Sequence, residues 1–218
     1  MVVLALSFFT AIIVVIVMSV RLFYRTLSIA RYADKAGLSF SREDGFEIPL
    51  KFGFFVFFSC GHSPRVSNIV YGRMNGSSIY AHDFCYEVGH GTRRLTRYYR
   101  VVIIDVPEVS SDLLMWNDID AAAAPMSIRQ ISGRYGNWSY AGRRELAECL
   151  WHEFSEIADC GVSFEITGGH LLLCVPFAHG KEIQHSELVD RCWNVAQKIR
   201  KVGEQCDIEE FVGCGQSA

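Results

Sequence analysis

The sequence lacks the short motifs that identify several large enzyme classes. It contains no Walker loop, no G-x-G-x-x-G, no G-x-S-x-G and no protein kinase signature, which argues against P-loop, dinucleotide-binding, α/β-hydrolase and kinase chemistry. Its seven histidines have no paired spacing, and its eight cysteines include no C-x-x-C. The sequence therefore predicts no metal site and no cofactor.

The sequence has neither a low hydrophobic content nor a large excess of charge of one sign. The 218 residues are 50% hydrophobic and 21% charged, with a net charge of −3, which excludes a disordered chain and a multi-span transporter. Scattered cysteines in apolar segments are typical of a reducing compartment. The even number of cysteines still permits four disulfides.

No charged side chain occurs before Arg21, and 16 of the 19 residues from Val2 to Val20 are apolar. As a helix this run rises about 29 Å, close to the roughly 30 Å of a bilayer hydrocarbon core. We therefore predict one transmembrane helix over residues 2–20. Two alternatives stay open. A cleaved signal peptide would need a basic start and a small-residue cleavage site, which are not present, and a buried core helix rarely has such a long uncharged run.

Basic residues collect directly after this run. Residues 21–35 carry Arg21, Arg25, Arg31 and Lys35 against one carboxylate, that of Asp34. By the positive-inside rule this asymmetry predicts a single-pass protein of the cell membrane whose C-terminal body is cytoplasmic. Residues 36–140 hold ten basic and ten acidic residues, and residues 141–218 hold seven and thirteen. Without a basic excess in the body, we expect no nucleic-acid partner.

The middle of the sequence has the pattern of an antiparallel meander. Asn75-Gly76 is a type I′ turn dipeptide, since both turn positions need a positive φ. It joins predicted strands over residues 67–73 and 78–86, and a third strand over 94–106 follows a glycine turn. The β-branched and aromatic content of these segments favours strands.

The last third has the pattern of a helix, a hairpin and a second helix. Gly168-Gly169 marks the hairpin turn, and Gly203 is a candidate end for the last helix. The four elements are predicted over residues 143–159, 162–166, 171–175 and 182–202.

Three segments have weaker patterns. Residues 39–47 are polar and are predicted as a connector, and the dense aromatic run 52–58 is predicted as a buried strand. Residues 110–140 show no regular pattern apart from a turn or short helical piece at 118–125.

A basic-flanked apolar start, a Phe-x-x-Phe segment, the run Asn68-Ile69-Val70-Tyr71-Gly72 with its hairpin, and the helix–hairpin–helix end occur in this order. The order resembles that of uncharacterised bacterial single-pass membrane proteins, which implies a topology and transfers no catalytic residue. We predict an α+β fold, a mainly antiparallel sheet (meander plus hairpin) with a long C-terminal helix, preceded by one transmembrane helix. This order of elements would also fit a pleckstrin-homology-like barrel.

The predicted organisation has four parts. They are a transmembrane anchor (residues 1–20), a basic juxtamembrane collar with a connector (21–46), an α+β cytoplasmic domain (47–203) and an acidic tail (204–218).

The basic cluster of the predicted domain lies on the third meander strand. Arg94, Arg97 and Arg100 surround Tyr98 there, and such a strand could bind a phosphate or an anionic lipid headgroup close to the anchor. Alternation places Arg94 and Arg100 with Tyr98 on one face and Arg97 on the other. The split weakens the case for one concerted ligand-binding site.

Cys60 and His62 are the candidates for catalysis. A cysteine near an imidazole can become a thiolate at neutral pH and act as a nucleophile. Catalytic pairs usually meet through the fold rather than in adjacent sequence, so the alternative interpretation is a loop after the aromatic run.

The sequence therefore favours a non-enzymatic role. We expect a membrane-tethered cytoplasmic binding or scaffolding module, with residues 2–20 in the membrane and either a protein or an anionic lipid as partner. The alternative is a membrane-bound hydrolase or thiol enzyme that uses Cys60 and His62.

Overall fold

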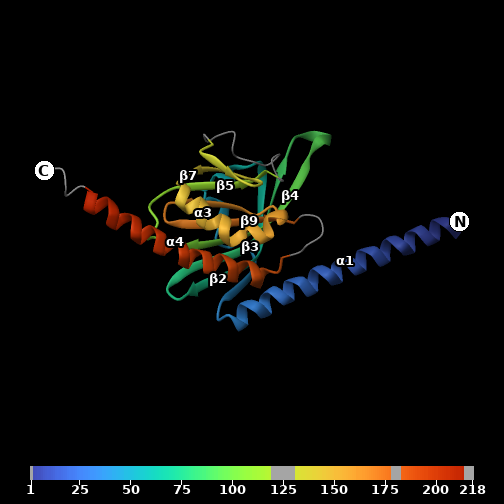
Figure 1. Cartoon of the computed structure of the whole chain (residues 1–218). Helices are drawn as coiled ribbons and strands as arrows, with labels where there is room; N and C mark the ends of the chain where they lie inside the picture. Colours follow the sequence, from blue (N-terminus) through green and yellow to red (C-terminus); the bar gives the residue numbers. More distant parts are fainter. Residues whose placement is uncertain (1, 119–130, 178–182, 214–218) are drawn as a thin grey trace.

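The computed structural model of the chain describes residues 2–118, 131–177 and 183–213. Helix α1 (Val2–Lys35) projects far beyond the body of the molecule (Figure 1). It contains no glycine or proline, so nothing interrupts the helix between the apolar run and the basic collar. The predicted anchor and the first part of the predicted collar therefore share one continuous helix.

Helix α1 ends in a glycine C-cap. Gly37 has a φ of 68°, and its N–H donates to the carbonyl of Asp34 (3.1 Å) while the Leu38 N–H donates to Ala33 (2.8 Å). These two bonds form the Schellman motif, which needs a left-handed residue such as glycine. The chain thereby turns directly from α1 into the sheet.

The described part of the body contains an antiparallel sheet of nine strands in the order β1-β2-β3-β4-β9-β8-β5-β7-β6. Together with the helices it confirms the predicted α+β class. The strands are β1 (Ser39–Glu43), β2 (His62–Met74), β3 (Ser77–Val88), β4 (Leu95–Asp105), β5 (Leu113–Asn117), β6 (Gly133–Tyr135), β7 (Trp138–Gly142), β8 (Ser163–Thr167) and β9 (His170–Pro176).

The predicted meander and hairpin are both confirmed. β2, β3 and β4 pair in sequence, and β8 pairs with β9. Asn75 and Gly76 have φ values of 46° and 90°, and Gly168 and Gly169 have values of 57° and 73°. Positive φ at both turn residues matches the twist of the flanking strands, which is why these dipeptides mark the turns.

The prediction of a connector over residues 39–47 is wrong for its first half. Ser39–Glu43 is strand β1, which pairs with β2 from Ser39 opposite Tyr71 to Glu43 opposite Ser67. β1 is an edge strand with no fully buried side chain. Backbone pairing alone defines it, so its side chains have no alternating apolar pattern.

The prediction of a strand over residues 52–58 is also wrong. The segment follows the helical turn α2 (Ile48–Lys51), which has Pro49 in its first turn, and it leads into the 3₁₀ turn Val56–Ser59. The buried Glu165 carboxylate accepts the backbone N–H groups of Val56 (2.8 Å) and Phe57 (3.2 Å). A short apolar run cannot distinguish a strand from a buried helical segment.

Both faces of the sheet are buried. On β4, Val102 and Ile104 join a cluster with the end of α1, α3 and α4, while Val101 and Ile103 join a second cluster with the aromatic segment after β1. This alternation follows from the period of two in a strand. The second cluster includes Ile48, Phe52, Phe55, Phe57, Phe58, Phe84, Tyr86, Tyr99 and Trp116.

Two helices cover the same face as the end of α1. α3 (Arg144–Phe154) continues into a 3₁₀ segment (Ser155–Cys160), and α4 spans His185–Gly213. α4 contains Gly203 in its interior, because one glycine costs a helix only about 1 kcal/mol. The predicted start of an acidic tail at residue 204 therefore falls inside α4. The far ends of α4 and α1 point in opposite directions from the body (Figure 1).

The weakly patterned region contains β5, β6 and β7 within residues 113–117 and 133–142. The turn predicted at 118–125 lies, apart from Asp118, outside the described residues. Among the described strands, β1 and β6 stand at the two ends of the order. The sheet is therefore open and differs from the barrel of the pleckstrin-homology analogy.

Candidate functional site

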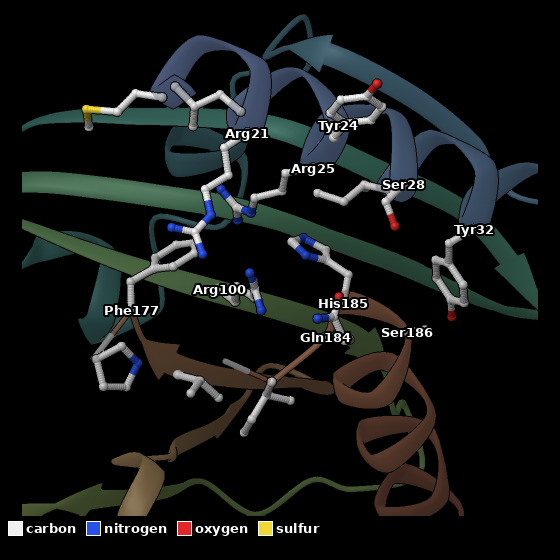
Figure 2. A pocket seen from close by; sticks show the side chains of 16 residues that line it. Arg21, Tyr24, Arg25, Ser28, Tyr32, Arg100, Phe177, Gln184, His185 and Ser186 are labelled. Atoms are coloured by element: carbon white, nitrogen blue, oxygen red, sulfur yellow. The ribbon is translucent and has the colours of Figure 1, made fainter. Parts of the chain in front are cut away.

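A cavity of about 750 Å³ lies between α1, the junction of β4 with the end of β9, and the start of α4 (Figure 2). One face of α1 forms its wall, from Met18 through Leu22 and Arg25 to Tyr32. These residues share a face because side chains three and four positions apart in a helix are neighbours. The cavity thus begins within the apolar run and extends to where α1 packs on the sheet.

Three arginines and no carboxylate line the cavity among the described residues: Arg21 and Arg25 from α1, and Arg100 from β4. The Arg25 and Arg100 guanidinium carbons lie 4.6 and 4.9 Å from the centre of the Phe177 ring. A ring face attracts cations, which partly offsets their mutual repulsion. Arg21 forms no ion pair with the described part of the chain.

Asp83 of β3 forms an ion pair with Arg25 and thereby connects α1 to the sheet. Its Oδ1 is 2.7 Å from Arg25 Nη2 and its Oδ2 accepts a 2.7 Å bond from Asn68 Nδ2. The Asn68 side-chain oxygen in turn accepts from the Thr26 hydroxyl at 3.1 Å. Asn68 has a φ of 53° at an irregularity of β2 between Ser67 and Val70, and such bulges redirect a side chain.

Burial changes the protonation of this network. It raises the pKa of the Asp83 carboxyl, although Arg25, Asn68 and Arg100 act in the opposite direction. His185, whose Nε2 is 3.7 Å from Asp83 Oδ1, has a pKa well below its ordinary value because of burial and the two arginines. His185 is therefore neutral at pH 7, and the positive charge of the cavity comes from arginine.

His82 and Asp83 point to opposite faces of β3, as alternation requires. His82 is fully buried and stacks on Phe58, with ring centres 6.2 Å apart. Burial lowers the pKa of His82 to about 3. The two buried histidines thus lie on different faces of the sheet, and both are neutral in the folded protein.

We expect acid to destabilise the full chain through His82 and His185. Below about pH 6.5 the unfolded histidines bind a proton and the folded ones do not, so stability present above that pH is lost as pH falls. From pH 7.5 to 5.5 each contributes a loss of about 1.4 kcal/mol in the free energy of unfolding. Urea unfolding in neutral detergent, followed by the buried Trp116 and Trp138, measures this.

The matched variants for this experiment are His185→Gln and His90→Gln. The first removes about half of the dependence, while the second, at an exposed position, leaves it unchanged. An unaltered pH dependence in His185→Gln would show that His185 is protonated in the folded state. Asp83 opposes the trend, because acid protonates its native carboxyl first, and the comparison between variants cancels that contribution.

The four predicted ligand-binding residues occupy different surroundings. Arg100 is buried, with 5% of its surface exposed, and lines the cavity. Arg94 precedes β4 and pairs with Glu87 at 3.1 Å. Tyr98 is exposed, and its ring packs edge-to-face with that of Phe177. Arg97 directly precedes Tyr98 on β4. Of the four, only Arg100 lies with the arginines of α1.

The two predicted catalytic residues contact other groups. The Cys60 thiol lies 3.6 Å from the carbonyl of Val56. His62 Nε2 is 2.9 Å from the Gly89 carbonyl and Nδ1 is 3.8 Å from Glu87. Both ring nitrogens of His62 therefore face oxygen atoms at the end of β3 and in the turn after it. Residues 2–118, 131–177 and 183–213 contain no group of three metal-ligating side chains.

Comparison with known proteins finds a likeness in fold to a solved structure. No family model matches the chain, and no curated protein matches it. A crystal structure of the mycobacterial trehalose monomycolate transport factor A, TtfA, is similar with a TM-score of 0.50 at 9% identity. The likeness covers 81% of this chain and 93% of that one, so the two proteins share a fold.

Proposed function

We propose that this protein is a single-pass, membrane-anchored binding or scaffolding module whose body lies against the cytoplasmic surface of the cell membrane. The observation that carries the proposal is the form of α1. The helix is long and apolar enough to cross a membrane, and its apolar window is not buried within the described residues. It then enters the body without a break.

The exposed apolar surface of α1 supports a bilayer as its environment. Its side chains include Phe8, Phe9, Ile13, Val15, Ile16, Val17, Met18, Leu22 and Phe23, each at least half exposed. Apolar surface costs roughly 25 cal/mol for each Å² left in water, so a continuous patch of this kind needs a partner. A hydrocarbon core supplies one along the whole run.

The positive charges of the collar support the orientation. Arg21, Arg25, Arg31 and Lys35 follow the span, and cytoplasmic flanks carry such an excess. The polar network of Asp83 and the cavity lie on the same side as the collar. The body is thereby held at the membrane surface, within reach of lipids and of other membrane proteins.

A binding role rather than a catalytic one agrees with the surroundings of Cys60 and His62 and with the arginine-lined cavity. The protein of similar fold is named a transport factor, which is compatible with a non-catalytic role. For this chain the ligand is argued from its own residues below.

Deletion of residues 1–20 tests the anchor. We expect the full chain to sediment with membranes and resist alkaline extraction, and the truncated chain to move to the soluble fraction. Replacement of residues 2–20 by another uncharged apolar sequence of equal length is the matched control and should retain membrane association. If the truncated chain still sediments with membranes and resists extraction, residues 2–20 are not its anchor.

Protease added to intact cells tests the orientation separately. A cytoplasmic body stays uncut until the cells are opened, whereas digestion of the body in intact cells would place it on the outer side.

A further inference from the structure

We propose that the cavity between α1, β4 and α4 binds an anionic phospholipid of the surrounding membrane, with the lipid phosphate at Arg21 and Arg100. The inference rests on the proposed function, because it takes the body to lie at the bilayer surface. The inference assigns a class of ligand to the cavity that lies between α1 and the sheet.

The charge of the cavity selects an anion. Arg21, Arg25 and Arg100 line it, no described carboxylate does, and the neighbouring Asp83 already pairs with Arg25. His185 does not contribute charge, since its pKa is lowered. Arginine binds phosphate through paired N–H donors, and Figure 2 shows the side chains of Arg21, Arg25 and Arg100 lying between Phe177 and His185.

The position of the cavity along α1 selects a lipid over a free anion. Arg21 is the first charged residue after the apolar run, which places it at headgroup level, and Arg25 lies about 6 Å further along the helix. The same wall continues toward the membrane through Met18, and Leu22 lies next to Arg21; both side chains are about 60% exposed. A phosphate at the arginines therefore leaves an attached acyl chain beside Met18 and Leu22.

Phe177 completes this amphipathic arrangement. Its ring makes cation–π contacts with the guanidinium groups of Arg25 and Arg100. The ring is also partly exposed in the cavity. The cavity thus combines an apolar entrance with a cationic interior, which matches a ligand with an acyl chain and an anionic headgroup. The basic collar would raise the local concentration of anionic lipids as well.

The test uses the full chain purified in a neutral detergent and titrated with short-chain phosphatidylglycerol or with phosphatidylcholine of the same chains. Bound lipid is counted by native mass spectrometry. We expect phosphatidylglycerol to bind about tenfold more tightly than the zwitterionic lipid. Equal binding of the two lipids would overturn the proposal.

The matched variants are Arg21→Gln and Arg31→Gln. Both positions are exposed on α1, but only Arg21 lines the cavity. We expect Arg21→Gln to weaken phosphatidylglycerol binding about tenfold and Arg31→Gln to leave it unchanged. Equal losses would indicate diffuse attraction to the collar and contradict a defined site. Arg100→Lys, which keeps the charge and loses the paired donors, should weaken binding in a chain that stays folded.

Inorganic phosphate separates the two sources of the anion. An excess of it should not displace the lipid, because the acyl chain contributes to binding, and displacement would overturn the lipid as ligand. Membrane fractionation reports the anchor independently. A chain that stays in the membrane and does not bind phosphatidylglycerol contradicts this inference alone, whereas a chain that binds the lipid in detergent but fractionates as soluble contradicts the proposed function.

Discussion

Replacing Asp83 by alanine is expected to lower the free energy of unfolding by about 1–3 kcal/mol, the usual cost of leaving buried or partly buried donors without their acceptor. The carboxylate is 2.7 Å from Arg25 and accepts a bond from Asn68. Without it, Arg25 loses this carboxylate while Arg25 and the buried Arg100 both remain beside the Phe177 ring. The Asn68 amide loses its acceptor as well.

The measurement is urea unfolding of the full chain in neutral detergent, with hydrogen exchange of α1 as a second readout. Amides of residues 26–35 should exchange faster in Asp83→Ala, since the network attaches this part of α1 to the sheet. Asp112→Ala, at an exposed carboxylate, is the matched control and should change stability by less than about 0.5 kcal/mol. A loss below 1 kcal/mol in Asp83→Ala would show that the ion pair does not hold α1 in place.

Replacing Phe57 by alanine is expected to cost about 3–5 kcal/mol, because the side chain is fully buried and a cavity would remain. Its ring lies 5.2 Å from those of Phe84 and Tyr99 and 6.2 Å from Trp116. These rings come from β3, β4 and β5. The single side chain therefore fills the space between the aromatic segment and three strands.

Phe54→Ala is the matched control for this prediction. Phe54 lies in the same segment but is 48% exposed, so its removal should cost less than half as much. Urea unfolding of both variants followed by tryptophan fluorescence makes the comparison, since Trp116 contacts Phe57 directly. Equal losses for the two variants would contradict the two-faced core described above.

Several features of the fold could be predicted because they depend on local chemistry. The turns at Asn75-Gly76 and Gly168-Gly169 follow from the positive φ that each position adopts. The apolar helix follows from twenty residues without charge. The period of two in a strand likewise explains why the neighbours His82 and Asp83 lie on opposite faces of β3.

The candidate site could be predicted only in part. Arg100 was recognised on its strand, but its companions were expected to be Arg94 and Arg97, the nearest arginines in sequence. The structure instead joins Arg100 with Arg21 and Arg25 from α1. The contact from Arg25 to Asp83 spans 58 positions in the sequence, and no local pattern encodes a contact at that separation.

The sequence by itself determined the long helices, the meander β2–β4, the hairpin β8–β9 and the turns within them, and that residues 2–20 suit a bilayer. These properties depend on φ preferences and on the period of apolar residues, which act over a few positions. The tertiary structure alone decided that Ser39–Glu43 forms an edge strand, that the phenylalanine segment coils over one face of the sheet, and that arginines from two distant elements enclose one cavity. Each of these depends on pairing and packing between distant segments, whose free energy exists only once the chain has folded.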